Sequence, residues 1–134
     1  MPGERELSRL LANLSPLLSA TEYVFCTFPG SAFGDTQGLS PVGAFMEDEG
    51  LTLVVPRAEA DGQGCAYDGI FRCITLRVHS SLDAVGLTAA VATALARNDI
   101  PANVVAAYHH DHVFVPAARA EDALAVLAGL ADTQ

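Results

Sequence analysis

The spacing of apolar residues at the start of the chain predicts a helix followed by a buried strand. Four leucines fall at i, i+3, i+4 and i+7 and form one apolar stripe of an amphipathic helix over residues 5–14. Such a stripe packs in a core or, as the alternative, presents a surface to a partner helix. Pro16 should end this helix near Asn13, because proline disfavours helical backbone in the preceding residue. Residues 23–28 are aromatic and β-branched, which predicts a strand buried on both faces.

The middle of the chain predicts a long loop and then a hairpin. Residues 29–43 contain several glycines and prolines and no clear periodicity, as is typical of a loop. Residues 42–47 and 51–55 are two expected strands, joined by the short turn at residues 48–50. A modest helix over residues 57–60 should follow the hairpin.

The second half alternates strand and helix patterns. Residues 70–78 alternate as in a strand, and residues 83–97 have the stripe of an amphipathic helix. Two further strands are expected over residues 103–108 and 113–115, around a polar turn of histidines and an aspartate. The last pattern, residues 118–130, predicts a helix with small and leucine side chains on its buried face.

An internal repeat indicates two related modules. Residues 51–60 resemble residues 111–120, since each run has a hairpin's second strand, a proline and an alanine-rich helix start. A β-α-β-β-α order fits an α+β fold of tandem ferredoxin-like modules, with antiparallel sheets and helices on one face. We place an incomplete N-terminal module, including the first helix, at residues 1–69 and a C-terminal module at residues 70–134. Neither has four strands of its own, so strand 70–78, the strand near Tyr23 or a second subunit must complete the sheets.

Composition excludes several classes of protein. The chain has 134 residues, enough for one compact unit or two small ones that share a core. Seven arginines and no lysine stand against sixteen Asp and Glu residues, a net charge of −9, which disfavours nucleic acid and anionic membranes as partners. A hydrophobic share of 51% excludes a disordered chain. Without a leader peptide or a long apolar run, we expect a cytoplasmic protein.

The three cysteines, Cys26, Cys65 and Cys73, show no C-x-x-C spacing. Cys26 and Cys73 lie in apolar alternating runs, where a thiol acts as a small hydrophobic side chain. Cys65 lies in a glycine-rich stretch, and no sequence feature marks it as a nucleophile.

The start of the predicted helix 83–97 is the first candidate site. Its unpaired N–H groups and the positive end of the helix dipole favour a carboxylate. Gly86 costs about 1 kcal/mol relative to alanine within a helix, and a residue without Cβ lets a ligand or another backbone come close. The alternative is an ordinary capped helix with a packing glycine. No P-loop spacing and no lysine are present, so a nucleotide site is not expected.

The run from Tyr108 to His112 is the second candidate site, with three histidines and Asp111. It is interpreted as a plain polar turn, as a turn that contacts a ligand, or as a weak divalent-metal site. No distant Cys or Glu completes a four-ligand set by pattern. Asp111 can pair with an ammonium or a guanidinium group. Serine, histidine and aspartate are available for a triad, but no Gly-x-Ser-x-Gly elbow exists, so we do not expect an enzyme.

Three runs of residues, 74–88, 100–104 and 110–116, together resemble the ACT-domain superfamily. More narrowly, the sequence is similar to small bacterial tandem-ACT proteins of uncharacterised function. It also resembles the ACT domains of amino-acid sensors and of aspartate kinases. The likeness extends over nearly the whole chain.

The resemblance implies modules that pair side by side and bind small effectors, commonly amino acids, without a cofactor. The loop into the helix would meet the ligand's carboxylate and ammonium, the hairpin aspartate its side chain, and the strand before the hairpin would line the pocket. The first half lacks such a glycine-bearing loop, so one site per chain is expected. The implied ligand-binding residues are Ser81, Asp83, Ala84, Val85, Gly86, Leu87, Asn103, Val104, Tyr108 and Asp111, and none is a metal ligand.

The sequence therefore predicts a regulatory or sensor protein that binds an amino acid or a similar small zwitterion and does not transform it. A homodimer or higher oligomer is the expected assembly. Two alternatives stay open, a ligand-free dimerisation or interaction module and weak divalent-metal binding at the His-His-Asp-His turn. Thermal-shift measurements with amino acids and metals would separate the three.

Overall fold

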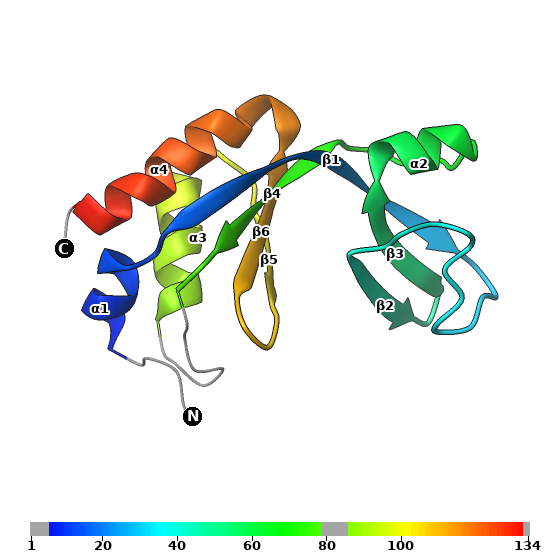
Figure 1. The fold of residues 1–134 in the computed structure, drawn as a ribbon, viewed down its shortest axis with the longest axis horizontal. Helices are drawn as coiled ribbons and strands as arrows, with labels where there is room; N and C mark the ends of the chain where they lie inside the picture. The colour runs from blue at the N-terminus through cyan, green and yellow to red at the C-terminus, as the bar shows by residue number, and fades with distance from the viewer. Residues whose placement is uncertain (1–5, 79–85, 133–134) are drawn as a thin grey trace. The chain divides into compact units, whose positions relative to one another are not determined.

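The computed structural model describes residues 6–78 and 86–132, which form two compact units (Figure 1). The terminal unit consists of Met1–Ala20 and Arg72–Gln134, and the inner unit consists of Thr21–Phe71. Strand β1 (Pro16–Phe28) contributes its first residues to the terminal unit and the rest to the inner unit. The sequence left open which strand completes each sheet. In the terminal unit this strand is β1, which supplies the fourth strand.

The N-terminal boundaries differ from the prediction. Helix α1 is only Leu7–Ala12, and β1 begins at Pro16, well before the predicted start at Tyr23. Proline is tolerated as the first residue of a strand, where no ladder donor is needed. The early part of β1 has partners that no local pattern reveals: the Arg77 amide donates to the Ser15 carbonyl over 3.4 Å, and the Cys73 amide donates to Ser19 Oγ over 3.3 Å.

The terminal unit is a four-stranded sheet in the order β1-β4-β6-β5, with helices α1, α3 and α4 on one face (Figure 1). Strands β5 and β6 pair antiparallel, with Ala106 opposite Asp111. The predicted α+β class, with antiparallel sheets and helices on one face, is confirmed. The elements are β4 (Phe71–Leu76), α3 (Leu87–Arg97), β5 (Asn103–Ala106), β6 (Asp111–Pro116), a 3₁₀ turn (Ala117–Arg119) and α4 (Ala120–Asp132).

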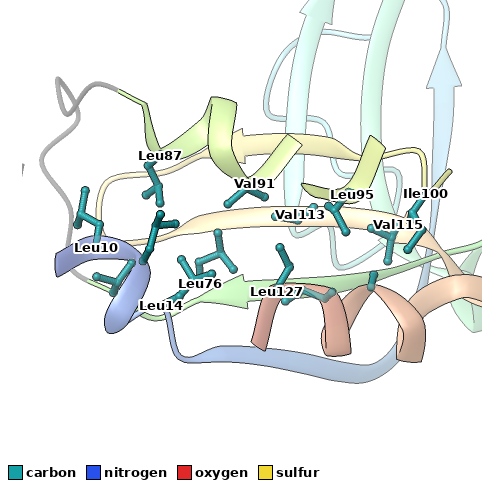
Figure 2. Close-up of a cluster of buried hydrophobic side chains, with 14 of the residues drawn as sticks. Leu10, Leu14, Leu76, Leu87, Val91, Leu95, Ile100, Val113, Val115 and Leu127 are labelled. Carbon is teal, nitrogen blue, oxygen red and sulfur yellow. The ribbon is translucent and has the colours of Figure 1, made fainter. Parts of the chain in front are cut away.

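The core of the terminal unit lies between its sheet and its three helices (Figure 2). Leucines of the predicted N-terminal stripe are fully or nearly buried there, which confirms the core interpretation of that stripe. Each such side chain contributes about 1.5–3 kcal/mol through burial. The largest fully buried side chains in the core of the terminal unit are Leu10, Leu14, Ile74, Leu76, Val91, Leu95, Val113, Val115 and Leu127.

The start of helix α3 and the turn between β5 and β6 lie at one end of the terminal unit's sheet. Helix α3 runs back along the sheet after β4, so its first turn lies at the end where β4 stops. Strands β5 and β6 are joined by a turn at that same end (Figures 1 and 2). The two candidate sites of the sequence are thus at the same end of one unit.

The inner unit has three antiparallel strands in the order β2-β3-β1, with a short helix α2 (Arg57–Gly62). The predicted hairpin is confirmed as β2 (Gly43–Glu47) and β3 (Gly50–Pro56). Gly50 has φ +148°, and a Cβ there would lie 2.8 Å from Pro29 Cα, so the turn requires glycine. The core of this unit comprises Val24, Cys26, Leu39, Leu51, Leu53, Val55 and Ala60.

Candidate functional site

Helix α3 begins after Gly86, which has φ +98° and lies in the left-handed region that favours glycine. A Cβ at Gly86 would lie 3.3 Å from Leu7 Cδ2, so this glycine also makes room for the first residue of α1. The N-cap residue Gly86 has no side chain with which to cap α3, and the first turn of the helix contains no acidic residue. The contact with Leu7 supports the interpretation of Gly86 as a packing glycine.

The remaining residues of the predicted loop fall into two groups. Ser81, Asp83, Ala84 and Val85 lie outside the described residues. The Leu87 side chain is 3% exposed and belongs to the core of the terminal unit. Only the backbone of Leu87 is therefore in a position to serve a ligand.

Asp111 is the first residue of β6 and not part of the turn, in contrast to the prediction. The turn spans residues 107–110 and closes through the Ala107 amide, which donates to the His110 carbonyl over 3.0 Å. The difference arises because Asp111 pairs with Ala106 across the hairpin. Asp111 is 9% exposed and is the one buried charged side chain found in the described part of the chain.

The surroundings of Asp111 are unfavourable to its charge. Burial raises the pKa of its carboxyl group, and the nearby His112 and His110 offset this effect in part. Among residues 6–78 and 86–132, no side chain forms a hydrogen bond or an ion pair with the Asp111 carboxylate. A buried carboxylate in this position is costly unless a partner with a positive charge or an N–H group comes to it.

The histidines next to Asp111 point in different directions. Successive strand residues face opposite sides of a sheet, and His112 Nδ1 lies 3.3 Å from Thr75 Oγ1. Burial lowers the pKa of His112. The Nδ1 atom of His110 is buried and has no hydrogen-bond partner in the described structure. Tyr108 is 75% exposed and meets the His109 ring edge-on, with ring centroids 4.9 Å apart.

The metal alternative requires several of these side chains to converge on one point. In the described ranges, no group of three His, Cys, Asp or Glu side chains is placed to hold a metal ion. The alternation of β6 explains this result, because it separates Asp111 from His112 across the sheet.

The two remaining predicted residues, Asn103 and Val104, lie in β5 and face opposite sides of the sheet. Val104 pairs with the buried Val113 and packs against the core, so it shares the helix-covered face with Asp111. Asn103 pairs with Phe114 and is exposed on the opposite face. Asp111 and Val104 thus share the helix-covered face of the terminal unit's sheet, and Asn103 lies on the opposite face.

Sequence reasoning missed the role of Leu7 at this site. Its side chain lies against Gly86 although the two residues are far apart in the sequence. The leucine stripe predicted that α1 packs in a core, but no sequence pattern names the element against which it packs.

The chain matches the ACT-domain family twice, over residues 2–72 and over residues 70–129. It therefore belongs to the ACT-domain family, and the resemblance noted in the sequence is confirmed. ACT domains are small-molecule-binding regulatory domains, and neither match is to a catalytic family.

Among solved structures, the protein VC0802 of Vibrio cholerae is 49% identical, with a TM-score of 0.84, 93% of this chain covered and 95% of that one. It is described as a protein of unknown function and possible transport protein. Protein Atu0741 of Agrobacterium tumefaciens is 22% identical, with a TM-score of 0.68 and coverages of 83% and 84%.

The regulatory subunit of aspartate kinase from Thermus flavus is 12% identical to this chain. Its TM-score is 0.61, with 86% of this chain and 95% of that one covered. At such low identities the last two likenesses show the fold alone. No curated protein matches the chain. In the described ranges, no helix has the length and apolar character needed to cross a membrane.

Proposed function

We propose that the protein is a non-catalytic sensor that binds an amino acid or a similar small zwitterion at the α3 end of the terminal unit. The observation that supports this proposal best is the buried Asp111 carboxylate, which has no partner among the described residues. The ligand's ammonium group would supply the missing partner.

The electrostatics of Asp111 favour a cation. Buried charges in proteins are paired, because an isolated carboxylate loses its hydration without compensation. Burial raises the pKa of Asp111, so an ammonium that pairs with it would restore the ionised form. Binding should therefore strengthen as the pH rises through the raised pKa of the free protein, until the ligand ammonium itself loses its proton.

The start of α3 favours an anion at the same end of the sheet. The first N–H groups of a helix lack intrahelical partners, and the helix dipole places partial positive charge there. Gly86, the N-cap residue of the helix, has no side chain with which to satisfy them. The Asp111 carboxylate favours a positively charged group and the start of α3 favours a negatively charged one. A zwitterion carries both groups, and ACT domains as a family bind amino acids.

The protein is also proposed to form a homodimer, as the sequence predicted. Strand β2 is an edge strand of the inner unit, and its Phe45 and Met46 are 71% and 49% exposed. Unpaired strand edges with apolar side chains associate readily with another chain. This observation also favours the second candidate function, a ligand-free dimerisation module.

The test is a thermal-shift screen of the twenty amino acids in the presence of a chelator, followed by calorimetric titration of each compound that raises the Tm. A ligand at a hundredfold excess over its Kd stabilises the folded state by about 2.7 kcal/mol, which the screen detects. Asp111→Asn should abolish the shift, because an amide cannot neutralise an ammonium. Asp48→Asn is the matched control, since Asp48 is an exposed turn carboxylate of the inner unit.

Three results would contradict the proposal in different ways. If no amino acid raises the Tm of the unmodified protein, the dimerisation module becomes the better explanation. If Asp111→Asn binds as tightly as the parent protein, Asp111 is not the ammonium partner. If Asp48→Asn also loses binding, the effect is a general loss of negative charge and not a property of one site.

A further inference from the structure

Two cysteines that are far apart in the sequence meet in the inner unit. Cys26 lies in β1 opposite Leu53 and is 3% exposed within the core of that unit. Cys65 follows α2 and packs against the same core. Cys65 lies close enough to Cys26 to raise the pKa of the Cys26 thiol, and both are free thiols in this structure.

The backbone after α2 holds Cys65 in this position. Gly64 has φ +69°, a left-handed conformation that turns the chain back toward the sheet. The Cys65 amide then donates to the carbonyl of the fully buried Ala60 over 2.9 Å. The position of the Cys65 backbone against the core that contains Cys26 is therefore fixed by this hydrogen bond.

A hollow of about 450 Å³ lies beside this part of the inner unit. Cys26 lines it together with the residues that directly follow Cys65, whereas Cys65 itself is not among the lining residues. Its volume lies within the range of ordinary small-molecule pockets. The complete lining is Phe25, Cys26, Thr27, Glu47, Thr52, Ala66, Tyr67 and Asp68.

We propose that Cys26 and Cys65 form a redox-modification site, at which a low-molecular-weight disulfide converts the two thiols into an intramolecular disulfide. This inference concerns the inner unit and is independent of the proposed amino-acid site. Cys73 is not part of the proposed pair, because it lies in β4 of the terminal unit.

The chemistry is two successive thiol–disulfide exchanges. The thiolate of Cys65, which is the more exposed of the two, attacks one sulfur of the small disulfide and releases one thiolate. Cys26 then gives its proton to solvent and attacks the Cys65 sulfur of the mixed disulfide, which expels the second thiolate. Two protein thiols are oxidised, and one small disulfide is reduced to two small thiols.

The order of these steps follows from the surroundings of each thiol. Burial, the largest effect, and the neighbouring Cys65 both raise the pKa of Cys26. Cys26 therefore remains protonated and unreactive toward a reagent in solution. It reacts once the mixed disulfide forms next to it. The Cys65 sulfur is then an electrophile held beside Cys26, and such an intramolecular reaction is much faster than one with a reagent in solution.

The experiment treats the intact protein with oxidised glutathione, alkylates the remaining thiols and digests the product with trypsin. Cleavage after Arg9, Arg57, Arg72 and Arg77 places the three cysteines in separate peptides. We expect the free thiols to fall from three per chain to one, with peptide 10–57 linked to peptide 58–72. The Tm should rise by several degrees and return on addition of dithiothreitol, because the cross-link restricts the unfolded chain.

Two variants serve as the matched test. Cys73→Ser should form the same cross-link, whereas Cys65→Ser should keep its remaining thiols unmodified. Cys65 is chosen because it is only half-buried, so its substitution spares the core. The proposal is overturned if three thiols persist, if Cys65 stops at the mixed disulfide with glutathione, or if the cross-link joins two chains or includes Cys73.

Discussion

At the scale of single residues, Asp111 is the most informative position in the protein. Its neighbours across the hairpin and in the core leave it 9% exposed, and burial raises the pKa of its carboxyl group. In the free protein, this carboxylate opposes folding at neutral pH. A residue that lowers the stability of the ligand-free protein is typical of a binding site. This agrees with the proposal that a ligand pairs with Asp111.

The sign of this effect gives a pH prediction. Because the pKa of Asp111 is higher in the folded than in the unfolded chain, the folded state binds more protons between the two pKa values. Stability from Asp111 is therefore present below the unfolded pKa and is lost as the pH rises through the folded pKa. Without ligand, Asp111→Asn should be more stable than the parent at pH 7, and this advantage should shrink toward pH 4.

Urea denaturation of both proteins across this pH range checks the prediction. His112, whose pKa burial lowers and the Asp111 charge raises in part, is present in both proteins, so the difference reports Asp111 together with its effect on His112. An advantage of Asp111→Asn that grows on acidification would contradict the proposed origin of the shift.

At the scale of elements, the periodic patterns predicted most helices and strands correctly. The hairpin of the inner unit and the buried stripe of α3 are close to their predicted bounds. The predicted start of β1 is wrong, because the local pattern around Pro16 indicates only the end of a helix. The strand conformation there depends on pairing with β4, which lies far along the chain, and no local pattern contains that partner.

The contact between the first residue of α1 and the start of α3 gives a second prediction. Gly86→Ala should destabilise the protein by about 1–3 kcal/mol, because it adds left-handed strain and crowds Leu7. Gly34 has the same φ of +98°, but a Cβ there would meet no other atom within 4 Å, so Gly34→Ala reports the strain alone. Chemical denaturation measures both variants.

Combining Gly86→Ala with Leu7→Ala completes the test. The double variant should recover the part of the loss that arises from crowding, because a smaller side chain at position 7 makes room for the new methyl group. If Gly86→Ala costs no more than Gly34→Ala, Leu7 does not restrict position 86.

At the scale of the whole molecule, each unit ends in an edge strand with exposed apolar residues. In the inner unit this strand is β2, with Phe45 at 71% exposure, and in the terminal unit it is β5, with Val105 at 48%. A net charge of −9 keeps separate chains apart over long distances, so association depends on such local apolar contacts. The proposed homodimer would use one of these edges.

Lysine substitutions distinguish the two edges. Phe45→Lys should weaken self-association by tenfold or more if β2 forms the interface, since a desolvated charge costs well over about 1.4 kcal/mol. Val105→Lys is the matched change on the other edge and should leave association unchanged. Sedimentation equilibrium measures both. The reverse result would assign the interface to β5, and a monomeric parent protein would remove the homodimer proposal altogether.

The α+β class and the main helices and strands could be predicted from local periodicity, and the acidic character follows from composition. The family was recognised from the resemblance of residues 74–88, 100–104 and 110–116. The burial of Asp111, the contact of Leu7 with Gly86, the place of β1 in the terminal unit and the proximity of Cys65 to Cys26 became known from the folded structure alone. Each of these depends on contacts between residues distant in the chain, because burial and proximity are properties of packing and not of a segment alone.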